Sequence, residues 1–171
     1  MLTVAQAAYL AGILDGEGCF SLRKSKNSAY HVYISEVAVG TTTPDLTDWL
    51  HAVIPGSIIH ASTPPGNREA SCTWRVSTKE GLTWMLPQVI EYLVIKKLHA
   101  QLLLKYCMQF ADQIPGVTLT PEEVELKNAY CVMFANLNAR GVGSLASKKR
   151  VISLFSEGSV ELPSSPAASS L

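Results

Sequence analysis

The order of helical and strand-like segments is the feature that most constrains this chain. Each of two segments with helical periodicity is followed by a pair of short segments rich in β-branched and aromatic residues. Two hairpins separated by a helix predict an α+β domain of αββαββα order: a four-stranded antiparallel, saddle-shaped sheet with helices on one face plus C-terminal helices. The expected helices are 3–15, 43–53, 77–93, 96–110 and 120–138, and the expected strands are 19–24, 30–39, 57–62 and 71–77.

Helix starts carry the most specific local signals. At four positions, a hydroxyl side chain that can cap a helix is followed by a Glu or Gln three residues later, or by a proline in the first turn. Both kinds of signal predict a helix that begins at that point. The sites are Thr3 with Gln6, Thr43 with Pro44, Ser77 with Glu80, and Thr120 with Pro121 and Glu123.

Composition predicts one folded domain. Apolar residues make up 47% of the chain and charged residues only 16%, which is enough to bury a core. We expect this domain to span 1–156, and the Ser-, Pro- and Ala-rich segment 157–171 to be a disordered tail. Without a long apolar run or a secretory leader, we expect an intracellular protein and no membrane partner. The four cysteines form no Cys-x-x-Cys pair, which favours reduced thiols over a zinc site.

Charge gives no direct sign of a nucleic-acid partner. Fourteen basic residues balance 14 acidic ones, whereas DNA-binding domains are usually basic. Any case for DNA binding must therefore rest on where the charges lie rather than on their sum.

Small residues gather on one side of the first helix. Ala8 and Gly12 are four residues apart and Ala11 lies beside them, so two such helices could approach closely. A single copy is present, so the second helix would come from another subunit and the chain would form a two-fold homodimer. The alternative is an Ala- and Gly-rich helix packed inside one core.

The segment Tyr9–Phe20 reads Tyr-Leu-Ala-Gly-Ile-Leu-Asp-Gly-Glu-Gly-Cys-Phe and closely resembles the LAGLIDADG motif of homing endonucleases. It departs from the motif by Ile-Leu for Leu-Ile, by Gly16 for Ala and by Glu17 for the second Asp. Segments around Trp74–Val76, Ile95–Lys97 and Asn136–Arg140 are also similar to that family. The resemblance implies an intron-encoded endodeoxyribonuclease of the single-motif, homodimeric type. Such an enzyme would make a metal-dependent double-strand break with 3′ overhangs in a near-palindromic double-stranded DNA site of roughly 20 bp.

The end of the first helix is the expected active site. A close helix pair would bring two Glu17 carboxylates together, and such a pair repels unless a cation neutralises it. The resemblance implies that Glu17, with the Gly16 carbonyl, binds Mg²⁺, and that Mn²⁺ or Ca²⁺ could take its place. It also implies a catalytic role for Lys96, which Lys97 could fill instead. Asp15 is expected at the dimer interface, bonded to local backbone. Alone, an exposed Glu after a helix and a solvated Lys-Lys pair would be the commoner interpretations.

The sheet face away from the helices is the expected DNA-binding surface, because β-ribbons fit the major groove. Val32 and Ile34 are expected to face the core, and Glu36 breaks the alternation, which suggests a bulge. An ordinary solvated sheet face would look similar. The candidate DNA contacts are Ser21, Arg23, Ser25, Lys26, His31, Tyr33, Ser35, His60, Ser62, Arg68, Thr73, Arg75, Arg140, Lys148, Lys149 and Arg150.

Two other functions stay open from the sequence. The first is a LAGLIDADG maturase or other DNA- or RNA-binding protein that does not cut. The second is a small α+β metabolic or ligand-binding protein, which leaves the nine-residue motif unexplained. The compartment is also undecided between an organelle, chloroplast or mitochondrion, and a prokaryotic cytoplasm.

Overall fold

The computed structural model describes residues 1–25, 32–63, 70–111 and 118–139. The sheet and most of the helices belong to one compact unit, Met1–Phe134. A second unit, Ala135–Leu171, is described only through the end of the last helix and Ala139. The expected tail at 157–171 lies outside the described residues, so the domain boundary stays a prediction.

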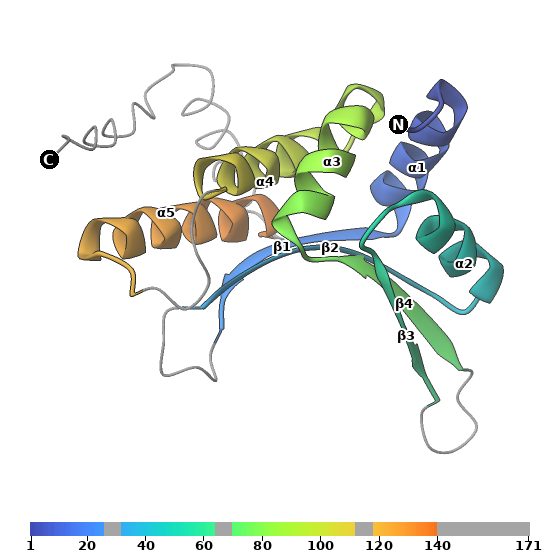
Figure 1. The fold of residues 1–171 in the computed structure, drawn as a ribbon, viewed down its shortest axis with the longest axis horizontal. Helices are drawn as coiled ribbons and strands as arrows, with labels where there is room; N and C mark the ends of the chain where they lie inside the picture. The colour runs from blue at the N-terminus through green and yellow to red at the C-terminus, as the bar shows by residue number, and fades with distance from the viewer. Residues whose placement is uncertain (26–31, 64–69, 112–117, 140–171) are drawn as a thin grey trace, which may run out of the picture. The chain divides into compact units, whose positions relative to one another are not determined.

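The observed elements follow the predicted αββαββα order, with the later helices after it (Figure 1). Most boundaries differ from the prediction by one to three residues, which is the usual uncertainty at element ends. The elements are α1 Val4–Gly16, β1 Gly18–Lys24, β2 Tyr33–Thr41, α2 Pro44–Val53, β3 Ile58–Ser62, β4 Ser71–Val76, α3 Lys79–Val89, a 3₁₀ turn η1 Ile90–Tyr92, α4 Lys97–Gln109 and α5 Pro121–Asn138.

The four strands form one antiparallel sheet in the order β1-β2-β4-β3. Helices α1 to α4 lie on one side of it, and the other side carries no helix among the described residues of this unit (Figure 1). The predicted α+β class and sheet are therefore confirmed. We call the uncovered side the open face.

Side-chain caps form as predicted at Thr3 and Thr120, whereas Thr43 precedes α2 without a side-chain cap hydrogen bond. Thr3 and Gln6 form a complete capping box at α1. The third helix differs, because the cap is Thr78, whose hydroxyl accepts from the Gly81 amide, rather than Ser77. A Cβ at Gly81 would lie 2.7 Å from Cγ1 of Val76, so glycine allows this helix to start directly against the end of β4.

The core lies between the sheet and the helices. Trp74 and Val76 of β4 and Val37 and Val39 of β2 are fully buried. Their burial fixes which side chains of β2 and β4 face the helices, since alternate residues of a strand share a face. The helices contribute the fully buried residues Leu10, Ala11, Leu14, Leu50, Leu82, Met85, Leu86, Val89, Ala100, Leu103 and Cys107.

Our prediction of which β2 side chains face the core was wrong. Ser35 is buried on the core side, and Ile34 and Glu36 lie on the opposite face. Strands β1 and β2 pair continuously from Gly18↔Val39 to Lys24↔Tyr33, so there is no bulge at Glu36. The polarity of Ser35 misled the assignment, because the alternation is set by the buried valines that follow it.

The polar groups on the core side of β2 have partners on the helices. The Tyr33 hydroxyl lies 2.8 Å from Oδ1 of Asn128 and 3.3 Å from the Val124 carbonyl, both on α5. Ser35 hydrogen-bonds the Cys107 thiol, and burial raises the pKa of that thiol to about 11. These bonds satisfy polar atoms that would otherwise be costly to bury.

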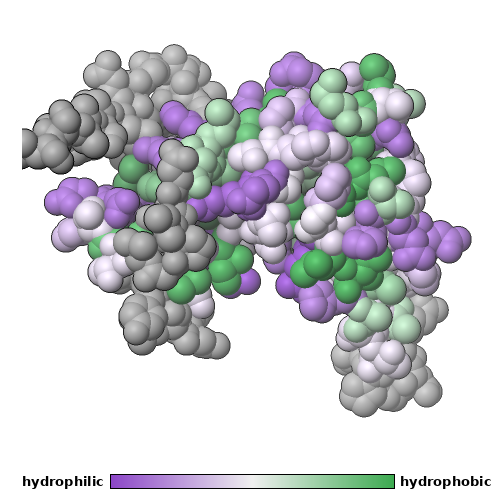
Figure 2. Space-filling view, viewed as in Figure 1, coloured by the Kyte–Doolittle hydropathy of each residue, from purple (hydrophilic) through white to green (hydrophobic). Residues whose placement is uncertain are grey.

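All four cysteines are free thiols, as predicted. The described residues contain no helix with the length and apolarity needed to cross a membrane. Figure 2 shows hydrophilic and hydrophobic residues interspersed on the side that it presents, so no single patch stands out there.

Candidate active site and nucleic-acid interface

Helix α1 is apolar almost all round, yet one side of it is exposed. Ala8 and Gly12 lie on the exposed side, and a Cβ built at Gly12 would meet no atom within 4 Å. The protomer's own packing therefore does not require glycine at this position. Val4 and Tyr9 on the same helix are 71% and 57% exposed. Ala11 is fully buried inside the protomer, so its predicted place in a dimer interface was wrong.

Glu17 follows the last turn of α1 and is exposed. Its amide donates to the Ile13 carbonyl at 2.8 Å, so the backbone at this position is held by the helix. At the next residue, a Cβ on Gly18 would lie 2.5 Å from the Leu14 carbonyl oxygen. Glycine thus lets β1 leave directly from the helix, with Glu17 at the junction between helix and sheet.

Asp15 binds backbone, but not the local backbone that the sequence suggested. Its carboxylate accepts amide hydrogens from Val94 at 2.7 Å, Ile95 at 3.2 Å and Lys96 at 2.9 Å. Partial burial raises the pKa of Asp15, but the three amides outweigh that effect and the net pKa is lowered. The carboxylate therefore fixes the segment before α4 against the end of α1.

Lys96 connects the same two segments a second time, through its side chain. Its ammonium donates to the Leu14 carbonyl at 2.9 Å and to the Gly18 carbonyl at 2.7 Å. The Leu14 carbonyl lies in the last turn of α1, where a positive charge is favoured, and the Gly18 carbonyl belongs to the first residue of β1. Lys97 instead pairs with Glu91 at 3.2 Å on the surface. The structure thus brings Lys96, rather than Lys97, to the residues on either side of Glu17.

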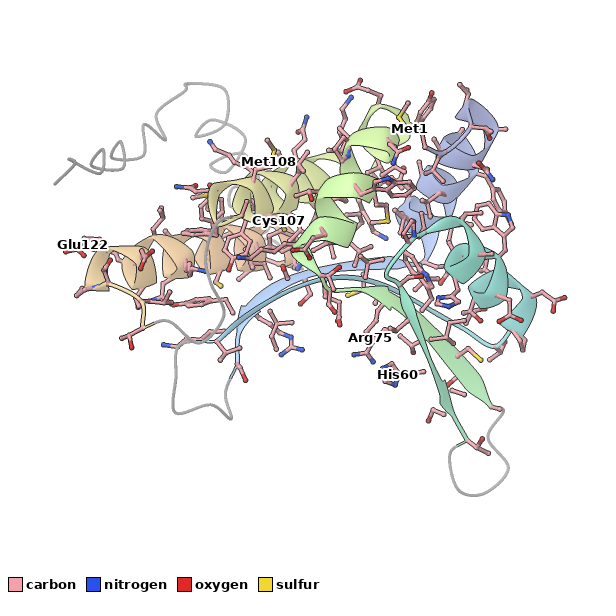
Figure 3. All side chains as sticks on the ribbon, viewed as in Figure 1. Met1, His60, Arg75, Cys107, Met108 and Glu122 are labelled. Carbon is pink, nitrogen blue, oxygen red and sulfur yellow. The ribbon has the colours of Figure 1, made fainter. Side chains whose placement is uncertain are left out.

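The open face consists of cross-strand rows. Antiparallel partners share a face, so Cys19, Ala38, Arg75 and Ile58 form one row across all four strands. Ser21 and Glu36 form a second row, and Gly40, Thr73 and His60 a third. In Figure 3, Arg75 and His60 project from the side of the sheet opposite the helices. The Arg75 guanidinium meets the Glu36 carboxylate at 3.5 Å.

Comparisons by sequence found no matching family model and no matching curated protein. Solved structures do match. The homing endonuclease I-CvuI, in complex with its target in the presence of 2 mM Ca, superposes with a TM-score of 0.62 at 14% identity, over 89% of this chain and 96% of that chain. I-SmaMI, described as a LAGLIDADG homing endonuclease bound to cleaved DNA, gives 0.59 at 19% identity, over 92% of this chain and 49% of its own.

The chain has the LAGLIDADG homing-endonuclease fold. The nine-residue motif and the fold therefore agree, although sequence comparison alone finds no relative. The chain spans nearly the whole of I-CvuI and about half of I-SmaMI.

Within the LAGLIDADG fold, several predicted contacts lie on the open face. Strand alternation places Ser21, Arg23, His60, Ser62, Thr73 and Arg75 there. Tyr33 and Ser35 face the helices instead, and Glu36 joins the open face. The alternating apolar residues Val37 and Val39, which are buried, were the sequence signal that Tyr33 and Ser35 also face the helices. Ser25 follows the end of β1, where its amide donates to Val32.

The remaining predicted DNA contacts lie outside the described residues, and their roles stay predictions. They are Lys26, His31, Arg68, Arg140, Lys148, Lys149 and Arg150.

The oxygen donors at the end of α1 suit a hard divalent cation in part. Glu17 offers an exposed carboxylate and Gly16 a backbone carbonyl, which are ligand types that Mg²⁺ accepts. Among the described residues, however, no three His, Cys, Asp or Glu side chains gather in one place. A metal here would need further oxygens from water, phosphate or a second copy of the chain.

Proposed function

We propose that this protein is a site-specific DNA endonuclease that makes a metal-dependent double-strand break. The observation that carries the proposal is the position of Glu17. Its carboxylate is exposed, and its backbone is held at the end of α1. The next residue begins β1, in which Ser21 and Arg23 lie on the open face. DNA lying along that face would have its backbone close to this carboxylate.

The proposed active form is a homodimer joined along the exposed side of α1. Ala8 and Gly12 leave room for a second helix to approach, and the exposed Val4 and Tyr9 would be covered by it. Two-fold symmetry would pair the Glu17 carboxylates and give two copies of the open face. The target would then be near-palindromic and roughly 20 bp long. I-SmaMI, with a chain about twice as long, is compatible with one chain supplying two such units.

Glu17 and the Gly16 carbonyl would hold Mg²⁺ beside the scissile phosphate. When bound, the ion would polarise the phosphate and lower the pKa of a water molecule. Asp15 and Lys96 position Glu17 by holding α1 against the start of α4. Lys96 already donates to two carbonyls, which leaves one ammonium hydrogen for a phosphate or an ordered water. Cuts staggered across the minor groove would leave 3′ overhangs.

Selection followed by cleavage tests the proposal. The purified protein is first used, without divalent cation, to select binding sites from random double-stranded DNA. Selected duplexes are then incubated with Mg²⁺. We expect both strands to be cut, and Glu17→Gln to bind the same duplexes but cut them about 100-fold more slowly or worse, because it removes the carboxylate ligand.

Asp48→Asn, which removes an exposed acidic charge on α2, serves as the control and should cut normally. Binding without cleavage by the unmodified protein would contradict the enzyme and support a maturase or other non-cleaving nucleic-acid-binding protein. Normal cutting by Glu17→Gln would remove Glu17 from the active site.

A further inference from the structure

The centre of the open face holds an acidic residue, which is unexpected on a surface that meets a polyanion. Glu36 lies on β2 opposite Ser21, and Arg75 lies on β4 opposite Ala38. The two side chains meet at 3.5 Å between Oε2 and Nη1. Their exposed fractions are 18% for Glu36 and 33% for Arg75, so both are partly enclosed but still reachable from the open side.

This pair carries no net charge, so it adds little to the attraction for phosphates, which depends on unpaired basic groups. It also leaves hydrogen-bonding capacity unused. Nε of Arg75 is buried without a hydrogen-bond partner among the described residues, so the donors open to an approaching base are those of the two Nη groups. One contact at 3.5 Å occupies only one of the five guanidinium hydrogens and one of the two carboxylate oxygens.

The neighbours of the pair on the β1 side leave room above it. On that side Arg75 shares its row with Ala38 and Cys19, and Glu36 shares its row with Ser21, all of which are small, whereas Ile58 lies beside Arg75 on the β3 side. A base edge could therefore approach both charged groups from the β1 side without displacing a bulky side chain. The ion pair also limits the rotamers of two long side chains before binding, which lowers the entropy cost of ordering them.

We propose that Glu36 and Arg75 together read one G·C base pair in each half-site, an inference that rests on the proposed DNA-binding function. In the major groove, guanine presents two acceptors, O6 and N7, and cytosine presents a donor, N4. The guanidinium supplies donors and the adjacent carboxylate supplies an acceptor, which matches that edge. An A·T pair places its adenine amino group and its thymine oxygen against groups of the wrong type.

Glu36 therefore determines specificity at one position, and it also holds Arg75 in place by its ion pair. The alternative is a purely structural ion pair on the sheet. Partly exposed pairs of that kind contribute little to stability, and their loss changes no base preference.

The test is selection of double-stranded DNA from a random pool in EDTA, followed by sequencing of the bound fraction. We expect the unmodified protein to enrich sites with a G·C pair at one position of each half-site. Glu36→Gln and Arg75→Lys should each reduce that preference about tenfold at that position and leave the others unchanged. Arg75→Lys keeps the charge but loses the planar fork of donors. Both changes are conservative and keep the strand intact.

Two control variants separate base reading from charge. Glu122→Gln removes an equal charge from an exposed position on α5 and should keep every preference. Arg23→Ala removes an exposed basic residue from the same face and should weaken binding to all sites, with a shallower salt dependence.

Enriched sites whose base preferences are the same for Glu36→Gln, Arg75→Lys and the unmodified protein would overturn the inference while leaving the proposed function intact. If the unmodified protein enriches no duplex at all, both the proposed function and the inference fail.

Discussion

Lys127 on α5 is a buried cation packed among aromatic rings. The residue is 4% exposed, and its ammonium lies 4.1 Å from the ring centroid of Phe110 and 5.3 Å from those of Tyr33 and Tyr106. The Tyr106 hydroxyl is 3.4 Å away. Burial, and then the nearby Lys79 ammonium, lower the pKa of Lys127 to about 8. Cation–π contacts thus offset only part of the cost of burying the charge.

Replacement of this lysine by a neutral side chain of similar length should stabilise the protein. We expect Lys127→Met to raise the free energy of unfolding at pH 7 by about 1–2 kcal/mol, because a buried charge is removed. The folded-state pKa of about 8 lies below the unfolded value of 10.5, so the penalty is complete below pH 8 and disappears as pH rises toward 10.5. Urea unfolding at pH 7 and pH 9 measures this difference.

Lys97→Met, at an exposed ion pair, is the matched control and should change stability little at either pH. A destabilised Lys127→Met protein would show that the three rings hold the ammonium more favourably than water does. A stabilisation that is the same at both pH values would contradict the assigned pKa shift.

At the scale of secondary-structure elements, the most specific contact joins the end of α1 to the start of α4. Asp15 accepts three amide hydrogens across it, so Asp15→Asn should lower the free energy of unfolding at pH 7 by about 1 kcal/mol. The pKa of Asp15 is lowered by folding, from its ordinary value of 3.8. Its stabilising effect is therefore present above that value and is lost as pH falls through the lower, folded-state pKa.

Denaturant unfolding of Asp15→Asn and of the unmodified protein, from pH 7 down to pH 3, checks this expectation. The gap between the two curves should narrow as the pH falls below 3.8. Asp48→Asn removes a similar charge on an exposed helix position and should run parallel to the unmodified protein. A constant gap between the Asp15→Asn and unmodified curves down to pH 3 would show that geometry, rather than charge, makes this contact stabilising.

For the whole molecule, the sequence predicts the order of elements, the sheet and the approximate helix starts well, because these depend on neighbours a few residues apart. Prediction from the sequence fails where the structure depends on residues that are far apart in the chain. The bond from Lys96 to Leu14 joins residues 82 positions apart, and the face to which each β2 side chain points depends on how the sheet packs against the helices. Ser35 and Lys127 are polar yet buried, so a rule that places polar residues outside misassigns them. Their partners on other elements are visible only in the fold.

The proposed assembly makes one prediction about the molecule as a whole. Gly12→Leu places a side chain on the exposed side of α1, where nothing in the protomer lies within 4 Å. The protomer should fold at least as stably, since leucine favours a helix by about 1 kcal/mol over glycine. If two copies meet along this side, the added side chain separates the helices. Sedimentation velocity should then show a dimer for the unmodified protein and a monomer for the variant.

Gly40→Leu is the matched control, because it adds the same side chain to open space on the sheet rather than on α1. This variant should remain dimeric while Gly12→Leu does not, and circular dichroism should show both folded. The difference between the two variants separates the assigned interface from any general effect of surface leucine. A Gly12→Leu dimer of undiminished strength would place the contact between copies elsewhere. The two Glu17 carboxylates would then not be paired by α1, and a shared metal site at a two-fold axis would lose its structural basis.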